Sequence, residues 1–364
     1  MMIQIQNNLS TIAAQFANQP ITNIQTFGSG NINDTFLVTL EESKFVLQRI
    51  NTQVFLQPQA VMQNMRVCTR HICDRLSSKS LDRRWETPQV ICTSDNQDYY
   101  IDENGSFWRA LSLIENSQSH DTIQNSDHAE EIGYALGMFH SLISDLPPEQ
   151  LSDTLEGFHI TPRYLEQYDR VLAEMTVARS IEVNYCLEFI RDRQSWAHVL
   201  ENAKESGKLA LRLMHGDPKI NNILMDTATG KAVSVIDLDT VKPGLIHYDI
   251  GDCLRSGCNT VGEETQDWET VQFEPDLCKG ILRGYLTEAK IFFNEQDYFY
   301  LFDSIRLISF ELGLRFFTDY LAGNVYFKTT YPEHNLMRAL VQFALTQSIE
   351  SQESSICKII EDLR

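Results

Sequence analysis

Three short apolar segments in the middle of the chain look like strands: 209–214, 223–225 and 232–236. The loop between the first two, residues 215–222, reads His-Gly-Asp-Pro-Lys-Ile-Asn-Asn and places Asp217 five residues before Asn222. A Thr-Ala-Thr-Gly turn joins the last two segments, and Asp237 comes directly after them. The strongest chemical motifs of the chain therefore gather on one strand-containing insertion.

The rest of the chain changes from strand-rich to helical. Strands are expected at 35–39 and 44–50, a helix at 61–76, and a second strand pair at 89–92 and 99–101. From Ser126 onward the pattern is helical, including a long helix near 303–321 that ends before Gly323. Because 364 residues exceed what one compact core usually holds, we expect an α+β bilobal fold. A small β-rich lobe would span residues 1–113, and a larger α-rich lobe residues 114–364.

The composition limits the partners of the protein. Its formal net charge is -20 at pH 7, which would repel nucleic-acid phosphates and anionic membranes, so we expect neither as a partner. The first residues lack a basic segment followed by a long apolar run, and no stretch is apolar enough to cross a bilayer. The eight cysteines are scattered without a C-x-x-C pair. We therefore expect a cytoplasmic globular protein with buried thiols.

Asp217, Asn222 and Asp237 have the side-chain types that phosphoryl transfer requires. A carboxylate such as Asp217 can orient an attacking hydroxyl and accept its proton. Magnesium takes only one or two protein carboxylates, so Asn222 and Asp237 form an adequate ligand set. Asp239 is expected to be an additional ligand or a contact to the substrate. The alternative is a loop of solvated carboxylates without a catalytic role.

The order H-x-D-x-x-x-x-N followed by a strand-borne Asp resembles the aminoglycoside phosphotransferase and choline kinase superfamily, which has the protein-kinase-like fold. The resemblance implies ATP as phosphoryl donor, Mg²⁺ as cofactor and a nucleotide-binding N-terminal lobe. It also implies that His215 orients the catalytic loop and is not the base. The Tyr-Asp-Ile element at 248–250 is similar to the family's brace of that loop, although Asp249 could instead be a helix N-cap.

The N-terminal lobe offers candidate residues for nucleotide binding. The segment 28–35 contains Gly30, Ile32 and Asn33 just before a strand, where glycines would let backbone amides approach phosphates. An ordinary β-turn is the alternative. On the next strand, Arg49 is the cation expected near the α- and β-phosphates, unless it merely faces solvent.

Two further expectations concern the same lobe. The helix at 61–76 has no Glu to pair with that cation, so phosphate anchoring should differ from the usual ion pair. Residues 107–116 should form the hinge between the lobes, with backbone groups of Ile114 and Glu115 near the adenine. The hinge assignment rests on chain order more than on residue types.

Several blocks resemble the N-acetylhexosamine 1-kinase branch of the superfamily. They lie at 30–35, 47–51, 114–116, 235–240 and 315–321. This resemblance implies phosphorylation of the anomeric hydroxyl of N-acetylglucosamine or N-acetylgalactosamine. Asp239, Arg315, Asp319 and Tyr320 would then contact the sugar. Arg315 and Asp319 are one helical turn apart, however, and could simply form a surface ion pair.

Other functions stay open on the sequence. A kinase for an amino alcohol, homoserine or an aminoglycoside would use the same catalytic residues, and an acidic lobe would suit polycations. The missing helix Glu also suggests a nucleotide-binding pseudokinase that regulates a partner. The intact Asp217, Asn222 and Asp237 count against that function.

Overall fold

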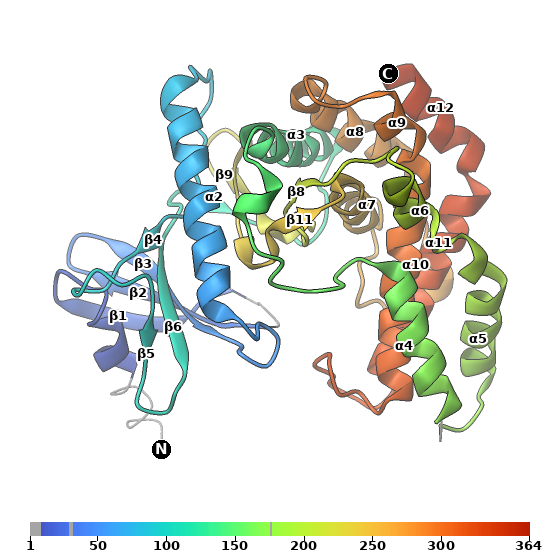
Figure 1. The fold of residues 1–364 in the computed structure, drawn as a ribbon, viewed down its shortest axis with the longest axis horizontal. Helices are drawn as coiled ribbons and strands as arrows, with labels where there is room; N and C mark the ends of the chain where they lie inside the picture. The colour runs from blue at the N-terminus through green and yellow to red at the C-terminus, as the bar shows by residue number, and fades with distance from the viewer. Residues whose placement is uncertain (1–8, 29–31, 175–176) are drawn as a thin grey trace.

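The computed structural model describes residues 9–28, 32–174 and 177–364, which form a strand-rich N-terminal part and a larger helical C-terminal part (Figure 1). The N-terminal sheet is antiparallel, in the order β1-β2-β3-β6-β4, with β5 also paired to β6. Its strands are β1 Ile21–Thr26, β2 Asp34–Leu40, β3 Lys44–Ile50, β4 Val90–Ile91, β5 Tyr100–Ile101 and β6 Phe107–Ser112. The helix α2, Pro58–Ser78, packs against this sheet. The α+β bilobal prediction is confirmed.

The two faces of the sheet have different neighbours because side chains alternate along a strand. Leu47 of β3 points to an outer face, which a short helix at residues 9–13 covers. Val46 packs on the opposite face, against the core that includes α2. Gln48 lies opposite Arg109 of β6 in the strand register, so both side chains lie on this inner face.

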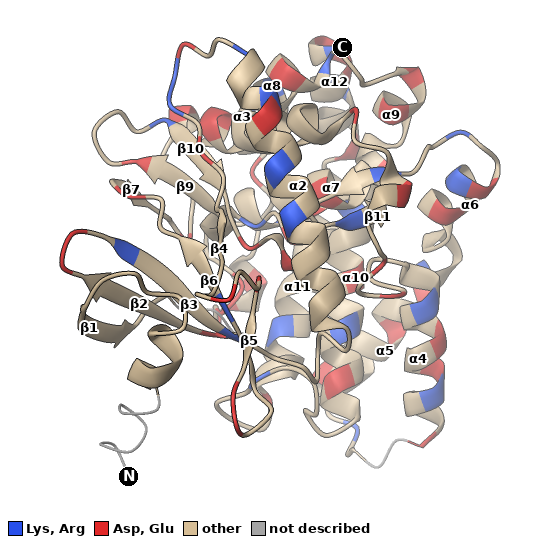
Figure 2. Ribbon diagram, turned by 60° about the vertical axis from the view of Figure 1, so that its left-hand side comes forward, with Lys and Arg blue, Asp and Glu red and all other residues tan. Residues whose placement is uncertain are grey.

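The C-terminal part consists mainly of helices. They are α3 Ser126–Ile143, α4 Thr161–Ala173, α5 Ile181–Arg193, α6 Val199–Glu205, α7 Ile246–Gly257, α8 Pro275–Ala289, α9 Glu295–Phe299, α10 Leu301–Leu321, α11 His334–Ser351 and α12 Glu353–Leu363. Figure 2 shows acidic residues along the helices and loops of both parts, in line with the negative net charge. Within the described ranges, no helix is both long and apolar enough to span a bilayer.

Two small sheets support the loops that contain Asp217 and Asp237. β8, Arg212–Met214, pairs with β11, Lys242–Gly244, and β9, Ile223–Asp226, pairs with β10, Ala232–Val235, and with β7, Ser117–Gln118. The loop 215–222 connects β8 to β9, and Asp237 follows the last residues of β10. The short strands therefore bring both loops to neighbouring positions between the two parts (Figure 1).

Two details of the predicted N-terminal lobe were wrong. The segments 89–92 and 99–101 do not pair with each other; β4 and β5 each pair with β6 instead. Residues 107–112 are not part of the hinge, because they form the buried strand β6. The connection between the two parts is therefore confined to residues 113–116.

Helices α3 and α8 cross at very short distance because glycines face the contact. A Cβ atom built on Gly133 of α3 would lie 1.8 Å from the carbonyl oxygen of Ile281 in α8. On the other helix, a Cβ atom on Gly284 would lie 1.9 Å from the carbonyl oxygen of Glu130. Only hydrogen fits at these positions, so the glycines fix the spacing of the two helices.

We predict that Gly133→Ala lowers the free energy of unfolding by about 3 kcal/mol, because the methyl group forces the two backbones apart. Urea denaturation would measure the loss. Gly207→Ala is the control: a Cβ there meets nothing within 4 Å, and only the φ of 73° opposes it. It should cost about 1 kcal/mol. Equal losses in the two variants would contradict the role of the close crossing.

Candidate active site

One buried carboxylate holds the start of the candidate catalytic loop, residues 215–222. Asp249, in the first turn of α7, accepts hydrogen bonds from the backbone N–H groups of His215 at 2.5 Å and Gly216 at 2.8 Å. His140 of α3 lies 2.8 Å from the same carboxylate. Although burial opposes the charge, these hydrogen bonds bring the pKa of Asp249 below its usual value. The N-cap of α7 is Leu245, so Asp249 does not cap the helix.

His215 connects the catalytic loop to the segment after β10. Its Nε2 lies 2.9 Å from the carbonyl oxygen of Ile236, and its Nδ1 lies 3.2 Å from the backbone nitrogen of Asp217. The N–H of Asp217 can only donate, so Nδ1 accepts and the ring proton is assigned to Nε2. Burial lowers the pKa of His215 and favours this neutral form. Both ring nitrogens are therefore engaged in holding the backbone.

Asp217 has one engaged and one uncommitted carboxylate oxygen. Its Oδ2 accepts hydrogen bonds from Lys219 Nζ at 2.9 Å and from Asn222 Nδ2 at 3.3 Å. No described residue donates a hydrogen bond to Oδ1. The charge of Asp217 raises the pKa of Lys219, which keeps the lysine positively charged. This arrangement leaves Oδ1 of Asp217 available to an incoming hydroxyl group.

Asp237 is a charged side chain without a partner. Its φ of 64° is left-handed, a conformation that costs a residue with a side chain about 1 kcal/mol or more. The side chain is open to solvent and forms no hydrogen bond or ion pair with the described residues. The surrounding protein and the negative charges of Asp239 and Asp217 raise the pKa of Asp237 to about 7. A cation bound here would relieve this repulsion.

The residues at this position fit a magnesium ion. Asn222 uses its Nδ2 to donate to the Asp217 carbonyl at 2.7 Å, so its Oδ1 is left as an oxygen donor for a metal ion. The Asn222 carbonyl also accepts the N–H of Ile236 at 2.9 Å, which ties the two segments together. No set of three or more acidic, His or Cys side chains forms a complete metal site in the described ranges. Magnesium suits such a sparse set, because water and phosphate fill its other positions.

Asp239 is buried and already has two partners. Its Oδ1 forms an ion pair with Arg109 Nη1 at 2.5 Å, and its Oδ2 accepts a hydrogen bond from Asn33 Nδ2 at 2.7 Å. The side chains of Arg109 and Asp239 are 1% and 2% exposed. A metal ion or a substrate would have to displace one of these partners to reach Asp239.

The structure describes two of the three candidate nucleotide-binding residues on the segment 28–35. Gly30 lies outside the described residues. Ile32 packs against a cluster that includes Ile50, and Asn33 accepts the backbone N–H of Asn51 at 2.9 Å in addition to its contact with Asp239. Asn33 therefore links this segment to the C-terminal part.

Arg49 lies away from the other candidate residues. It follows Gln48 on β3, so its side chain is on the outer face of the sheet. Its side chain is 50% exposed, forms an ion pair with Asp34 and lies 5.9 Å from the Trp108 ring. The predicted contact of Arg49 with nucleotide phosphates is therefore not supported by its position. The alternative, a solvent-facing Arg, describes it correctly.

Ile114 and Glu115 lie in the short connection between the two parts. The carbonyl of Ile114 accepts a hydrogen bond from Ser117 Oγ at 2.6 Å, and the carbonyl of Glu115 accepts one from Arg84 Nη2 at 2.7 Å. The Ile114 side chain is buried, whereas Glu115 is exposed. The connection is thus fixed by hydrogen bonds at the place where an adenine contact is expected.

Arg315 is a cation surrounded by aromatic rings. Its guanidinium carbon lies 5.2 Å from the Phe158 ring, 5.0 Å from the Tyr164 ring and 5.6 Å from the Phe327 ring. It forms no hydrogen bond or ion pair with the side chains in the described ranges. Although burial opposes its charge, the pKa of Arg315 is raised by the charges of Tyr164, Glu311 and Tyr326, with a smaller contribution from Asp217. Arg315 is therefore an available cation near the catalytic loop.

Asp319 and Tyr320 have other surroundings. Asp319 is buried and accepts hydrogen bonds from the backbone N–H groups of residues 325–327 and from Asn335, so it does not pair with Arg315. Tyr320 stacks on Phe317 and packs at the edge of an apolar core cluster. The prediction that these two residues contact substrate is not supported by their positions, because Asp319 holds the loop after α10.

His159 is a residue of the site that the sequence analysis missed. Its Nε2 lies 2.8 Å from the carbonyl oxygen of Gly216, and its Nδ1 lies 2.8 Å from Glu311 of α10. Burial opposes a charged ring, but the charge of Glu311 raises the pKa of His159 above its usual value. A protonated ring can donate to both partners and hold the loop at the carbonyl of Gly216. An isolated His offers no sequence signal for this contact.

The comparison with protein families decides the class of protein. The sequence profile of the phosphotransferase enzyme family matches residues 23–277, more than half of the chain. The chain belongs to this family. It is therefore a phosphotransferase, as the order of Asp217, Asn222 and Asp237 predicts.

Solved structures agree with the predicted fold of this phosphotransferase. A microcompartment-associated aminopropanol kinase is 16% identical, with 97% of this chain and 98% of that chain covered and a TM-score of 0.64. A choline kinase from Cryptosporidium parvum is 14% identical, with coverage of 98% and 99% and a TM-score of 0.62. A spectinomycin phosphotransferase, solved with ADP and spectinomycin, is 12% identical, with coverage of 98% and 98% and a TM-score of 0.55. The protein-kinase-like fold is confirmed.

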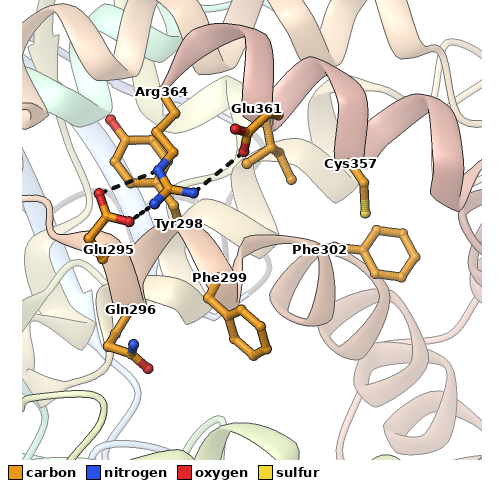
Figure 3. A pocket seen from close by; sticks show the side chains of 9 residues that line it. Glu295, Gln296, Tyr298, Phe299, Phe302, Cys357, Glu361 and Arg364 are labelled. Carbon is orange, nitrogen blue, oxygen red and sulfur yellow. Dashed lines mark hydrogen bonds and ion pairs between the residues drawn. The ribbon is translucent and has the colours of Figure 1, made fainter.

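A cavity of about 290 Å³ lies elsewhere on the phosphotransferase, between α9, the start of α10 and α12 (Figure 3). Arg364 forms ion pairs there with Glu295 and Glu361. Phe299 and Cys357 also line it, and none of the candidate site residues does. This cavity is separate from the candidate active site.

The raised pKa of Asp237 gives a test that needs no substrate. A carboxyl group whose pKa is higher in the folded protein contributes stability below its ordinary pKa of 3.8, and this contribution is lost as the pH rises through about 7. Without metal at pH 8, the charged side chain should therefore destabilise the fold. We predict that Asp237→Asn raises the Tm in EDTA by about 2 °C at pH 8 and by less at pH 5, a small shift because solvent screens the charge.

Thermal unfolding at the two pH values would measure this difference. Asp95→Asn, at an exposed loop position, is the matched control and should leave the Tm unchanged. A lower Tm for Asp237→Asn at pH 8 would contradict the assigned repulsion.

Proposed function

We propose that this phosphotransferase is an ATP- and Mg²⁺-dependent sugar kinase. It would transfer the γ-phosphoryl group to the anomeric hydroxyl of N-acetylglucosamine or N-acetylgalactosamine. One observation carries the choice of acceptor: Arg315, a cation without a polar partner in the described ranges, lies among aromatic rings near Asp217. A sugar ring can pack on aromatic faces while its hydroxyl and acetamido oxygens accept hydrogen bonds from a guanidinium group.

The mechanism uses positioning more than covalent chemistry. The acceptor hydroxyl would bind at the uncommitted Oδ1 of Asp217, which orients it for in-line attack and accepts its proton. Asn222 and Asp237 would hold the magnesium ion, which neutralises phosphate charge when it is bound. Lys219, held at Asp217, adds a further positive charge beside the transferred group. Asp249 and His159 keep the loop in place throughout.

The charge of Arg315 separates the candidate acceptors. Choline, amino alcohols and polycationic aminoglycosides would be repelled by an unpaired guanidinium group in a partly buried site. Homoserine is the second candidate, because its carboxylate could pair with Arg315. A cytoplasmic location and the lack of nucleic-acid and membrane partners stay predictions from the composition.

An acceptor screen tests the proposal directly. Purified protein with ATP and MgCl₂ should release ADP with N-acetylglucosamine or N-acetylgalactosamine, and much less with glucose, choline, homoserine or kanamycin. Phosphorus NMR of the product should identify a sugar 1-phosphate. In Arg315→Met, kcat/KM for the sugar should fall roughly 100-fold, the effect of losing a charged hydrogen-bond donor, with the KM for ATP unchanged.

The exposed Arg283, on α8, provides the matched control for this variant. Arg283→Met should keep the activity of the wild type. If Arg315→Met kept full activity on the sugar, or if choline were the best acceptor of the wild type, the choice of acceptor would be wrong.

Asp217→Asn tests the catalytic assignment and the pseudokinase alternative together. We predict a fall in kcat of about 10²- to 10⁴-fold, because the amide cannot accept the proton. The affinity for ATP, measured by calorimetry, should stay within about twofold, since Asp217 would contact the acceptor and not the nucleotide. A wild-type protein that binds ATP but turns over no acceptor would favour the pseudokinase.

A further inference from the structure

One cation is buried on the inner face of the N-terminal sheet. Among the Lys and Arg residues of the described N-terminal part, only Arg109 has a fully buried side chain. It lies on β6 opposite Gln48 of β3, and Gln48 Oε1 accepts hydrogen bonds from its Nε at 2.9 Å and its Nη2 at 2.7 Å. The strand register therefore fixes the guanidinium group on the face toward α2 and the catalytic segments.

Kinases also use a cation of the N-terminal sheet to bind phosphate, but they place it on another strand. That cation is a Lys on β3, paired with a Glu of the neighbouring helix. Here the residue of β3 opposite Arg109 is Gln48, which has no charge. The helix α2 contains no Glu, and its acid Asp74 is exposed; the residues of α2 that face Arg109 are Met62 and Met65, whose sulfur atoms lie 4.0 and 3.8 Å from Nη1. Both members of the usual pair are thus replaced by neutral side chains.

Asp239 supplies the missing counter-charge from the other part of the protein. It contacts Arg109 at 2.5 Å, and it stands two residues after Asp237, the candidate magnesium ligand. Arg109 is also close enough to Asp237 for its charge to act on that carboxyl group. The guanidinium group is therefore directed at the place where the phosphates of a magnesium-bound nucleotide would lie.

We propose that Arg109 is the residue that anchors the nucleotide phosphates in this protein, and that Asp239 holds its charge until the nucleotide binds. This inference rests on the proposed use of a nucleotide as phosphoryl donor. Since Arg109 is buried, a phosphate group reaches it by taking the place of the Asp239 carboxylate. A planar guanidinium group can exchange a carboxylate for two phosphate oxygens without changing its own geometry.

This exchange would couple the binding of the nucleotide to the binding of the acceptor. Asp239 loses its main partner when a phosphate binds Arg109, and its contact with Asn33 links the same event to the segment 28–35. The released carboxylate becomes available to the acceptor or to the metal ion. Asp239 thus pairs with Arg109 before the nucleotide binds and is released when a phosphate takes its place. In this structure it is buried in the paired arrangement.

Calorimetry with ADP and with adenosine tests this inference, because only ADP carries phosphates. Arg109→Met should weaken ADP binding by about 10- to 100-fold, the effect of losing a charge-assisted contact, and should leave adenosine binding within about twofold. Arg109→Lys should weaken ADP binding less, since lysine keeps the positive charge and loses only the planar group that can bind two phosphate oxygens. Asp239→Asn removes the competing carboxylate and should tighten ADP binding. Measurements in EDTA and in MgCl₂ separate the effect of the metal.

Two further variants complete the design. Lys44→Met, at an exposed position of β3, is the control and should bind ADP as the wild type does. Arg49→Met tests the rival cation on the outer face. Thermal unfolding of each variant shows that it is folded; if Arg109→Met is not, Arg109→Lys and Asp239→Asn carry the test.

Three results would overturn the inference. Arg109→Met could weaken ADP and adenosine equally or weaken neither, Arg49→Met could show the selective loss instead, or Asp239→Asn could weaken ADP as strongly as Arg109→Met. The last result would mean that the ion pair is only a brace between the two parts. The assay contains no acceptor, so an error in the proposed sugar does not affect it. A wild-type protein that binds neither ADP nor adenosine would overturn the nucleotide donor itself.

Discussion

The buried carboxylate of Asp249 is the contact on which the site depends. A carboxylate inside a protein is costly unless hydrogen bonds satisfy its charge. The partners of Asp249 are His140 of α3 and the backbone of His215 and Gly216. They meet only when α3, α7 and the catalytic loop have packed together. The folding of the helical part and the positioning of Asp217 are therefore one event, and the glycine crossing of α3 with α8 sets the geometry in which it occurs.

Three carboxylates lie close together near this brace, and they differ in their electrostatic partners. Asp239 is neutralised by the buried Arg109, and Asp217 shares its charge with Lys219. Asp237 has no partner among the described residues, and its pKa is raised by the surrounding protein and by the other two carboxylates. The site therefore has one unmet negative charge, at Asp237. A cation would therefore be stabilised most at Asp237.

The sequence could place the candidate catalytic residues in neighbouring loops because these residues are close along the chain; their roles stay predictions. Asp217, Asn222 and Asp237 lie in loops at the ends of three consecutive short strands, so local structure alone brings them together. The predicted contact of Arg49 with phosphates is not supported, for a physical reason. Adjacent strand residues point to opposite faces of the sheet, and which face is inner depends on the pairing of β3 with β6. The cation of the inner face is Arg109, about sixty residues further along the chain.

Helix faces set a similar limit in the C-terminal part. The spacing of Arg315 and Asp319 predicts that they share a side of α10, but the loop at 325–327 returns over the helix and takes the Asp319 carboxylate for its own N–H groups. His159 reaches Gly216 from 57 residues away through a left-handed backbone position with φ of 61°. Contacts of this kind depend on tertiary packing, which a single sequence does not reveal.

The missing Glu in α2 has a different meaning once the position of Arg109 is known. A kinase-like chain without the helix Glu would leave its phosphate-binding Lys unpaired, which is the reason for suspecting an inactive protein. In this chain the cation has moved to β6, and its counter-charge comes from Asp239 in the catalytic segment. The helix then needs no Glu at this position, and methionine side chains can fill the space beside the guanidinium group. The absence of the Glu is thus a consequence of where the ion pair forms, and it gives no physical reason to expect a loss of phosphoryl transfer.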